Sequence, residues 1–168
     1  MSRDFPDWVN PERAASARRD FAGTMPLARL PRVADLVVGD GDDEIRFVLA
    51  FSRNELGQVK VDVEISGRVQ MRCQRTLAIF EQPLDSRSVV GVVASEDDAD
   101  ALPDDYEPVL CPDQRLELAS LVEEEVLLSL PLVPIDPASS PVGQAVAEEE
   151  ETQRPFEVLA ELRKKRET

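Results

Sequence analysis

Apolar and polar residues alternate with a period of two through the middle of the chain. The alternation is strictest over residues 59–65 and also runs over 45–51. A period of two buries one row of side chains and leaves the other row in water, as in a strand with one wet face. Two further strands are predicted over residues 77–82 and 88–94, and glycine allows a bend or bulge at 66–67. Short connections between these strands favour an antiparallel meander.

Helices are predicted on both sides of these strands. Asn10 followed by proline is typical of a helix start, and this helix is expected to continue to about Asp20 with three arginines. A second short helix is predicted over residues 30–39. The longest helix is predicted over residues 113–130 and is stopped by Pro131.

One broad apolar face of the longest helix contains Glu125, whereas Glu123 and Glu124 lie outside it. A buried carboxylate without a partner is costly, so we expect Glu125 to have one. An arginine or backbone partner that holds the helix on the sheet is favoured over a role in a groove or an exposed position. Arg72 and Arg75 are the candidate arginines.

The C-terminal part of the sequence changes character after the longest helix. Pro134 keeps the residue before it extended. Residues 137–154 are rich in Pro, Ser, Ala and Glu without any period, which predicts an acidic flexible linker. Residues 155–168 predict a short amphipathic helix with Phe156 and Leu159 on its apolar side. The basic residues that follow are Arg163, Lys164, Lys165 and Arg166.

These elements predict an α+β fold for a single domain over residues 1–136. Its sheet is an antiparallel β-meander of about five or more strands, with helices packed on one face. The pattern leaves open whether the sheet stays open or becomes partly barrel-like.

Charge limits the kinds of partner that the chain can bind. Its 168 residues carry a formal net charge of −15. Phosphate backbones repel such a chain, because nucleic-acid affinity comes mostly from Lys and Arg. We therefore expect RNA contacts to be local or to be made through another protein. The chain has no apolar run of about 20 residues and no signal-peptide pattern, which indicates the cytoplasm.

The sequence offers few residues for catalysis. It contains no histidine and no glycine-rich phosphate-binding motif. The prediction is therefore a protein that is not an enzyme, with no cofactor and no bound metal. A metal-dependent nuclease is the enzymatic alternative, but it needs carboxylates that converge on Mg²⁺, and no spacing singles out such a set.

An acidic run over residues 95–107 contains no basic residue. One interpretation is a solvated loop, and the other is an attractive surface for a basic partner. The candidate partner-binding residues on the body of the chain are Asp97, Asp98, Asp104, Asp105, Glu107, Glu123 and Glu124, and those on the tail are Phe156 and Leu159.

Five short pieces, in order along the chain, resemble a known family. They are Asn10-Pro11, Cys73-Gln74-Arg75, Ala101-Leu102-Pro103 with Tyr106-Glu107-Pro108, residues 121–134, and Pro155-Phe156 with Val158-Leu159 and Leu162. In this set the sequence is similar to the bacterial YceD family, whose members are described as large ribosomal RNA subunit accumulation proteins. The resemblance implies a role in the synthesis, processing or stability of the large-subunit rRNA, without an established catalytic site.

The sequence departs from that family at a set of positions with zinc-ligand spacing. Relatives often carry Cys-x-x-Cys where this chain has Cys73 and Thr76, and a His where it has Asp136, followed by another Cys. A structural zinc is therefore expected to be absent. Cys73 is predicted to be a small buried residue of a strand. Cys111 is not part of that pattern, and an exposed thiol is one interpretation of it.

The leading functional hypothesis is a ribosome-biogenesis factor that binds a basic ribosomal protein or rRNA-processing factor, while its arginine-bearing terminal helices contact RNA. The alternative is a direct RNA-binding module with a strand-face platform of Lys60, Arg68, Arg72 and Arg75. Against it stand the net charge and the scarcity of aromatic residues for base stacking, since the chain has one Trp and one Tyr. The candidate RNA contacts are Arg72, Arg75, Arg163, Lys164, Lys165 and Arg166.

Overall fold

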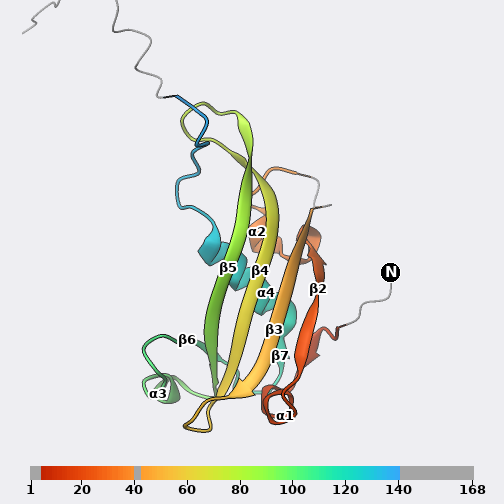
Figure 1. Cartoon of the computed structure of the whole chain (residues 1–168), viewed down its shortest axis with the longest axis vertical. Coiled ribbons are helices and arrows are strands. Elements are labelled where there is room, and N and C mark those ends of the chain that lie inside the picture. Colours follow the sequence, from red (N-terminus) through yellow and green to blue (C-terminus); the bar gives the residue numbers. More distant parts are fainter. Residues whose placement is uncertain (1–4, 40–42, 141–168) are drawn as a thin grey trace, which may run out of the picture. The chain divides into compact units, whose positions relative to one another are not determined.

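A five-stranded sheet with strand order β2-β3-β4-β5-β6 forms the centre of the computed structural model, which describes residues 5–39 and 43–140 (Figure 1). The strands are β2 (Asp20–Pro26), β3 (Glu44–Arg53), β4 (Val59–Arg72), β5 (Ile79–Val93) and β6 (Glu107–Leu110). The first four pair antiparallel in chain order, whereas β6 pairs parallel with β5. The predicted α+β fold is confirmed, and the sheet is open, with β2 and β6 at its edges.

The β4–β5 pair is longer and more regular than the sequence pattern predicted. Its register is unbroken from Val59 opposite Val92 to Arg72 opposite Ile79, so residues 66–67 form no bulge. The two predicted strands at 77–82 and 88–94 are one strand. Pro83 lies within this strand, where proline is tolerated because β6 covers only the last part of β5 and leaves the rest as a sheet edge.

The packing of β3 against β4 explains why position 67 is glycine. A Cβ atom there would lie 3.1 Å from Cδ1 of Ile45 and 3.4 Å from the carbonyl oxygen of Glu44. Gly67 therefore lets β3 and β4 approach closely at this point of the inner face.

The core lies on one face of the sheet, under α4 (Leu118–Ser129), which crosses β4 and β5 (Figure 1). The short helix α2 (Pro31–Ala34) packs beside α4, after a turn of 3-10 helix at Leu27–Arg29. The largest fully buried side chains include Phe47, Phe51, Met25, Leu27, Leu30, Ile45, Leu49 and Leu118. On the opposite face, Leu102 lies over Gly91, where a Cβ atom would come within 2.5 Å of the leucine side chain. This contact brings the chain after α3 (Glu96–Ala99) against the outer face of the sheet.

Both N-terminal helices are shorter than predicted. Helix α1 (Pro11–Ser16) begins as expected, since Oδ1 of Asn10 accepts a 2.9 Å hydrogen bond from the backbone N–H of Arg13. It stops before Asp20 because Arg18 adopts a left-handed backbone with φ of 47° and Asp20 already begins β2. Helix α2 ends at Ala34 rather than near residue 39.

The longest helix also begins later than predicted. Residues 113–117 do not join α4, because Gln114 has a left-handed φ of 51° and Leu116–Glu117 form strand β7. Strand β7 pairs antiparallel with β1 (Trp8–Val9), and the two form a separate two-stranded sheet. The predicted stop is confirmed, because α4 ends at Ser129, two residues before Pro131.

The chain divides into two compact units, Met1–Asp136 and Pro137–Thr168. The predicted linker over 137–154 and the predicted helix over 155–168 remain predictions, because residues 141–168 lie outside the described part. Residues 40–42 of a predicted turn also lie outside it. Among the described residues, no helix has the length and apolar character needed to cross a membrane.

Candidate functional site

The acidic run over residues 95–107 contains a single helical turn and leads into β6. Ser95 is the N-cap of α3, and its Oγ accepts a hydrogen bond from the backbone N–H of Asp98. The carboxylates of the run are exposed to solvent: Glu96, Asp97, Asp98, Asp100, Asp104, Asp105 and Glu107. Five of them, Asp97, Asp98, Asp104, Asp105 and Glu107, are predicted partner-binding residues, and the structure leaves these five accessible.

Glu107 joins this run to helix α4. Partial burial of its carboxyl group, followed by the nearby charges of Glu125 and Glu124, raises the pKa of Glu107 above its ordinary value. Neighbouring negative charges raise the pKa of a carboxyl group only when they lie close to it. Glu107 and Glu124 therefore belong to one acidic surface, in which Arg32 pairs with Glu124 at 2.8 Å.

Glu123 does not belong to that surface, which corrects the prediction that it lies outside the buried side of the helix. Its side chain is buried, and its carboxylate accepts hydrogen bonds from the backbone N–H of Arg32 at 2.8 Å and from Nε of Arg32 at 3.0 Å. Leu30, the residue before α2, cannot cap that helix with its own side chain. Glu123 supplies the missing acceptor from α4 and so holds α2 against it.

Glu125 is buried as predicted, but its predicted arginine partners are wrong. Its carboxylate accepts hydrogen bonds from the hydroxyl groups of Ser86 and Ser88 on β5. The sequence pattern missed these serines because it placed the break between two strands here. A signal was present, since Ser86 and Ser88 are two residues apart and therefore share a face of one strand.

The four basic residues of the predicted strand-face platform for RNA do not form one patch, and two of them are paired with carboxylates. Lys60 pairs with Asp62 at 3.0 Å, and Arg68 pairs with Glu81 at 3.2 Å. Arg72 and Arg75 lie near the β4–β5 connection, where Arg72 donates to the carbonyl oxygen of Leu77 and Arg75 donates to that of Asp136. Six predicted site residues lie outside the described part of the chain: Phe156, Leu159, Arg163, Lys164, Lys165 and Arg166.

Cys73 lies just beyond β4, in the connection to β5, and not in a strand as predicted. Its thiol is buried, and Sγ accepts a 3.4 Å hydrogen bond from the backbone N–H of Asp136. The carbonyl oxygen of Pro134 accepts another, of 2.8 Å, from the backbone N–H of Gln74. The extended segment after Pro131 is thereby attached to the connection between β4 and β5.

The same connection makes the Cys73 thiol unusually acidic. The hydroxyl of Thr76, and then the backbone N–H groups of Asp136, Thr76 and Arg75, lower the pKa of Cys73 to about 6 against the opposing effect of burial. Cys73 is therefore more than a small apolar residue. The interpretation of Cys111 as an exposed thiol is excluded, because that thiol is buried and burial raises its pKa.

The residues at the positions of the family's zinc ligands do not fit a structural zinc site. The structure brings Cys73, Thr76 and Asp136 together, but they supply only one sulfur, and Cys111 lies beside Val93. Structural zinc takes four ligands that are mostly Cys and His. Within the described residues no three His, Cys, Asp or Glu side chains form a metal-binding cluster, so the metal-dependent nuclease alternative finds no ligand set there.

We expect the stability of the fold to rise with pH through the titration of Cys73. Because the folded-state pKa of about 6 lies below the ordinary value of 9.0, the thiolate form favours the folded state as pH increases from about 6 to 9. Urea unfolding at several pH values across this window tests the prediction. Cys73→Ala should remove this part of the rise, and Thr76→Val should reduce it. An identical pH profile for wild type and Cys73→Ala would contradict it.

Comparison with known proteins identifies the family. The family model described as large ribosomal RNA subunit accumulation protein YceD matches residues 61–163, which is more than half of the chain. The chain belongs to the YceD family. A relative from Haemophilus influenzae, named large ribosomal RNA subunit accumulation protein YceD, is 31% identical over 173 residues, which cover 96% of this chain and 97% of the relative. A search of the solved structures found no match.

The segment that matches the YceD family model includes the acidic run. The matched segment begins within β4 and continues through β5, the acidic run and α4 to Arg163. The family resemblance predicted from five short pieces is confirmed. The name of the relative refers to accumulation of the large ribosomal RNA subunit and to no chemical reaction.

Proposed function

We propose that this chain supports accumulation of large-subunit rRNA as a non-catalytic binding protein. Its acidic surface would hold a basic segment of a ribosomal protein or of an rRNA-processing factor. We assign to this surface the exposed carboxylates Asp97, Asp98, Asp104 and Asp105 of the acidic run, together with Glu107 and Glu124. The observation that carries the proposal is the run of solvent-exposed carboxylates over residues 95–107, which contains no basic residue.

The physical argument is one of charge complementarity. Close carboxylates repel one another, and a cationic segment placed between them relieves this repulsion. Complementary charge also speeds encounter and disfavours acidic competitors. The net charge of −15 suits a protein that attracts a basic partner without binding RNA indiscriminately.

The first experiment measures the ratio of large- to small-subunit rRNA, with precursor ends mapped, in cells depleted of this protein. We expect a selective loss of the large-subunit species, which the wild-type chain restores. An unchanged ratio with normal ends would overturn the role in rRNA accumulation.

A matched pair of variants then tests the acidic surface. Neutralising Asp97, Asp98, Asp104 and Asp105 to Asn should abolish rescue, because the exposed charges that hold the partner are lost. The control neutralises four exposed carboxylates elsewhere, with Asp35→Asn, Asp43→Asn, Glu44→Gln and Asp85→Asn, and changes the net charge equally. Equal rescue by the two variants would count against the surface while leaving the cellular role in place.

A further inference from the structure

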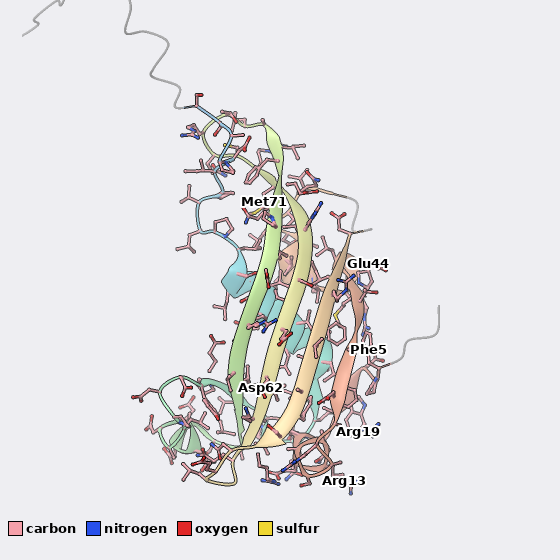
Figure 2. The ribbon with its side chains drawn as sticks, viewed as in Figure 1. Phe5, Arg13, Arg19, Glu44, Asp62 and Met71 are labelled. Atoms are coloured by element: carbon pink, nitrogen blue, oxygen red, sulfur yellow. The ribbon has the colours of Figure 1, made fainter. Side chains whose placement is uncertain are left out.

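A hollow of about 550 Å³ lies between the N-terminal segment, α1 and the start of β2. Its lining includes Trp8, Asn10, Arg13, Arg19, Asp20 and Phe21. Figure 2 shows Arg13 and Arg19 at the same end of the molecule. None of the residues that line this hollow belongs to the acidic surface.

Arginines around this hollow are left without acidic partners. Within the described residues, none of Arg13, Arg18, Arg19 and Arg115 forms an ion pair. Arg29, Arg32, Arg53, Arg68 and Arg87, by contrast, are each paired with Asp or Glu. In a chain with 34 acidic and 19 basic residues, a group of unpaired arginines indicates an anionic ligand. The lining contains one carboxylate, that of Asp20.

Aromatic side chains stand beside these arginines. Trp8 is 45% exposed, and the guanidinium carbon of Arg115 lies 4.6 Å from the centroid of its ring. The guanidinium carbon of Arg19 lies 5.6 Å from the centroid of Phe21. Indole rings and guanidinium planes are the surfaces on which unpaired bases stack. Exposing a large aromatic ring is otherwise unfavourable in water.

Tertiary pairing builds this arrangement from two distant parts of the chain. Strand β1 pairs with β7, so that Trp8 lies opposite Glu117 and Val9 lies opposite Leu116. The side-chain amide of Asn10 donates a 3.1 Å hydrogen bond to Oε1 of Gln114. These contacts hold Arg115 over Trp8 at the rim of the hollow.

We infer that this hollow binds a short segment of single-stranded RNA. Arg13 and Arg19 contact phosphates inside it, Arg18 and Arg115 extend the cationic rim, and a base stacks on the Trp8–Arg115 pair. An acidic peptide would use the cations but not the stacking surface, and the bases of a duplex are already stacked on one another. The site extends the proposed function, since it gives the chain a direct contact with RNA that is separate from its protein-binding surface.

The test measures binding of a fluorescently labelled single-stranded RNA of roughly ten nucleotides to the full chain by anisotropy, at about 0.1 M salt. At this salt concentration charges more than about 10 Å away are largely screened, so the distant carboxylates contribute little. Arg13→Gln with Arg19→Gln should weaken binding at least about tenfold and flatten the salt dependence, because each lost phosphate contact removes about 0.7 from the log–log slope.

Trp8→Leu should weaken binding about tenfold with an unchanged salt slope, because it removes stacking but no charge. The matched control is Arg46→Gln with Arg87→Gln, which removes two arginines from the outer face of the sheet that do not line the hollow. Its affinity should stay within about twofold of wild type. Thermal unfolding of each variant checks that its fold is retained.

Several results would overturn the site. They are no binding by the wild-type chain, equal weakening by the pocket variant and the control, tighter binding of the same sequence as single-stranded DNA, or equally tight binding of duplex RNA. The measurement needs no cellular partner, so its failure leaves the proposed protein-binding role standing. Conversely, an unchanged ratio of large- to small-subunit rRNA in depleted cells would overturn the role in rRNA accumulation and would leave this RNA site standing.

Discussion

Replacing Glu123 with alanine is expected to lower the free energy of unfolding by about 2–3 kcal/mol. The carboxylate is buried and accepts two hydrogen bonds from Arg32, one from its backbone N–H and one from its guanidinium. Removing it leaves that N–H at the start of α2 without an acceptor. It also loosens α2, whose Val33 is fully buried in the core. Urea unfolding of the two proteins measures the difference.

Glu124→Ala is the matched control on the same helix. Glu124 contacts the same arginine at 2.8 Å, but its side chain is 52% exposed. An exposed ion pair contributes at most about 1 kcal/mol, so this variant should remain close to wild type. Equal losses for the two alanine variants would show that Arg32 pairing, and not the cap on α2, determines the effect.

Phe47→Ala should cause the larger loss, of about 3–5 kcal/mol. Phe47 is 1% exposed at the centre of β3, and the ring of Phe5 packs edge-on against it with centroids 4.8 Å apart. Truncation removes apolar burial, leaves a cavity in the core and breaks the aromatic pair. The midpoint of urea unfolding measures the loss.

Two further variants separate these contributions. Phe5→Ala keeps Phe47 in the core and removes the aromatic pair, whose geometry contributes about 0.5–1.5 kcal/mol beyond burial. Phe47→Leu fills most of the cavity and should recover much of the stability. A loss below about 1 kcal/mol for Phe47→Ala would contradict the central position of this side chain.

The sequence alone determined the features that depend on local geometry. Strict alternation identified β4 and most of β3, because a strand with one buried face must place apolar residues at every second position. Asn10 before proline identified the start of α1, and Pro131 identified the end of α4, because capping and proline act on the nearest backbone groups. Membership of the YceD family was also evident from the sequence, because five short pieces of it follow one another in the order that the family shows.

Tertiary structure decided which distant residues meet. Ser86 and Ser88 hold Glu125, Arg32 holds Glu123, and β6 joins β5 in parallel. The sequence pattern does not record which of these partners meet, because each contact depends on how one element is placed against another. Pro83 shows the same limit, since proline disrupts a central strand but is accepted at a sheet edge.

The hollow beside Trp8 combines both kinds of information. The sequence placed Arg13, Arg18 and Arg19 close together on one short stretch. Only the pairing of β1 with β7 brought Arg115 over Trp8, and only the folded chain revealed which arginines lack carboxylates. A pattern read along one chain records which side chains are buried, whereas the identity of their neighbours is set when the elements pack.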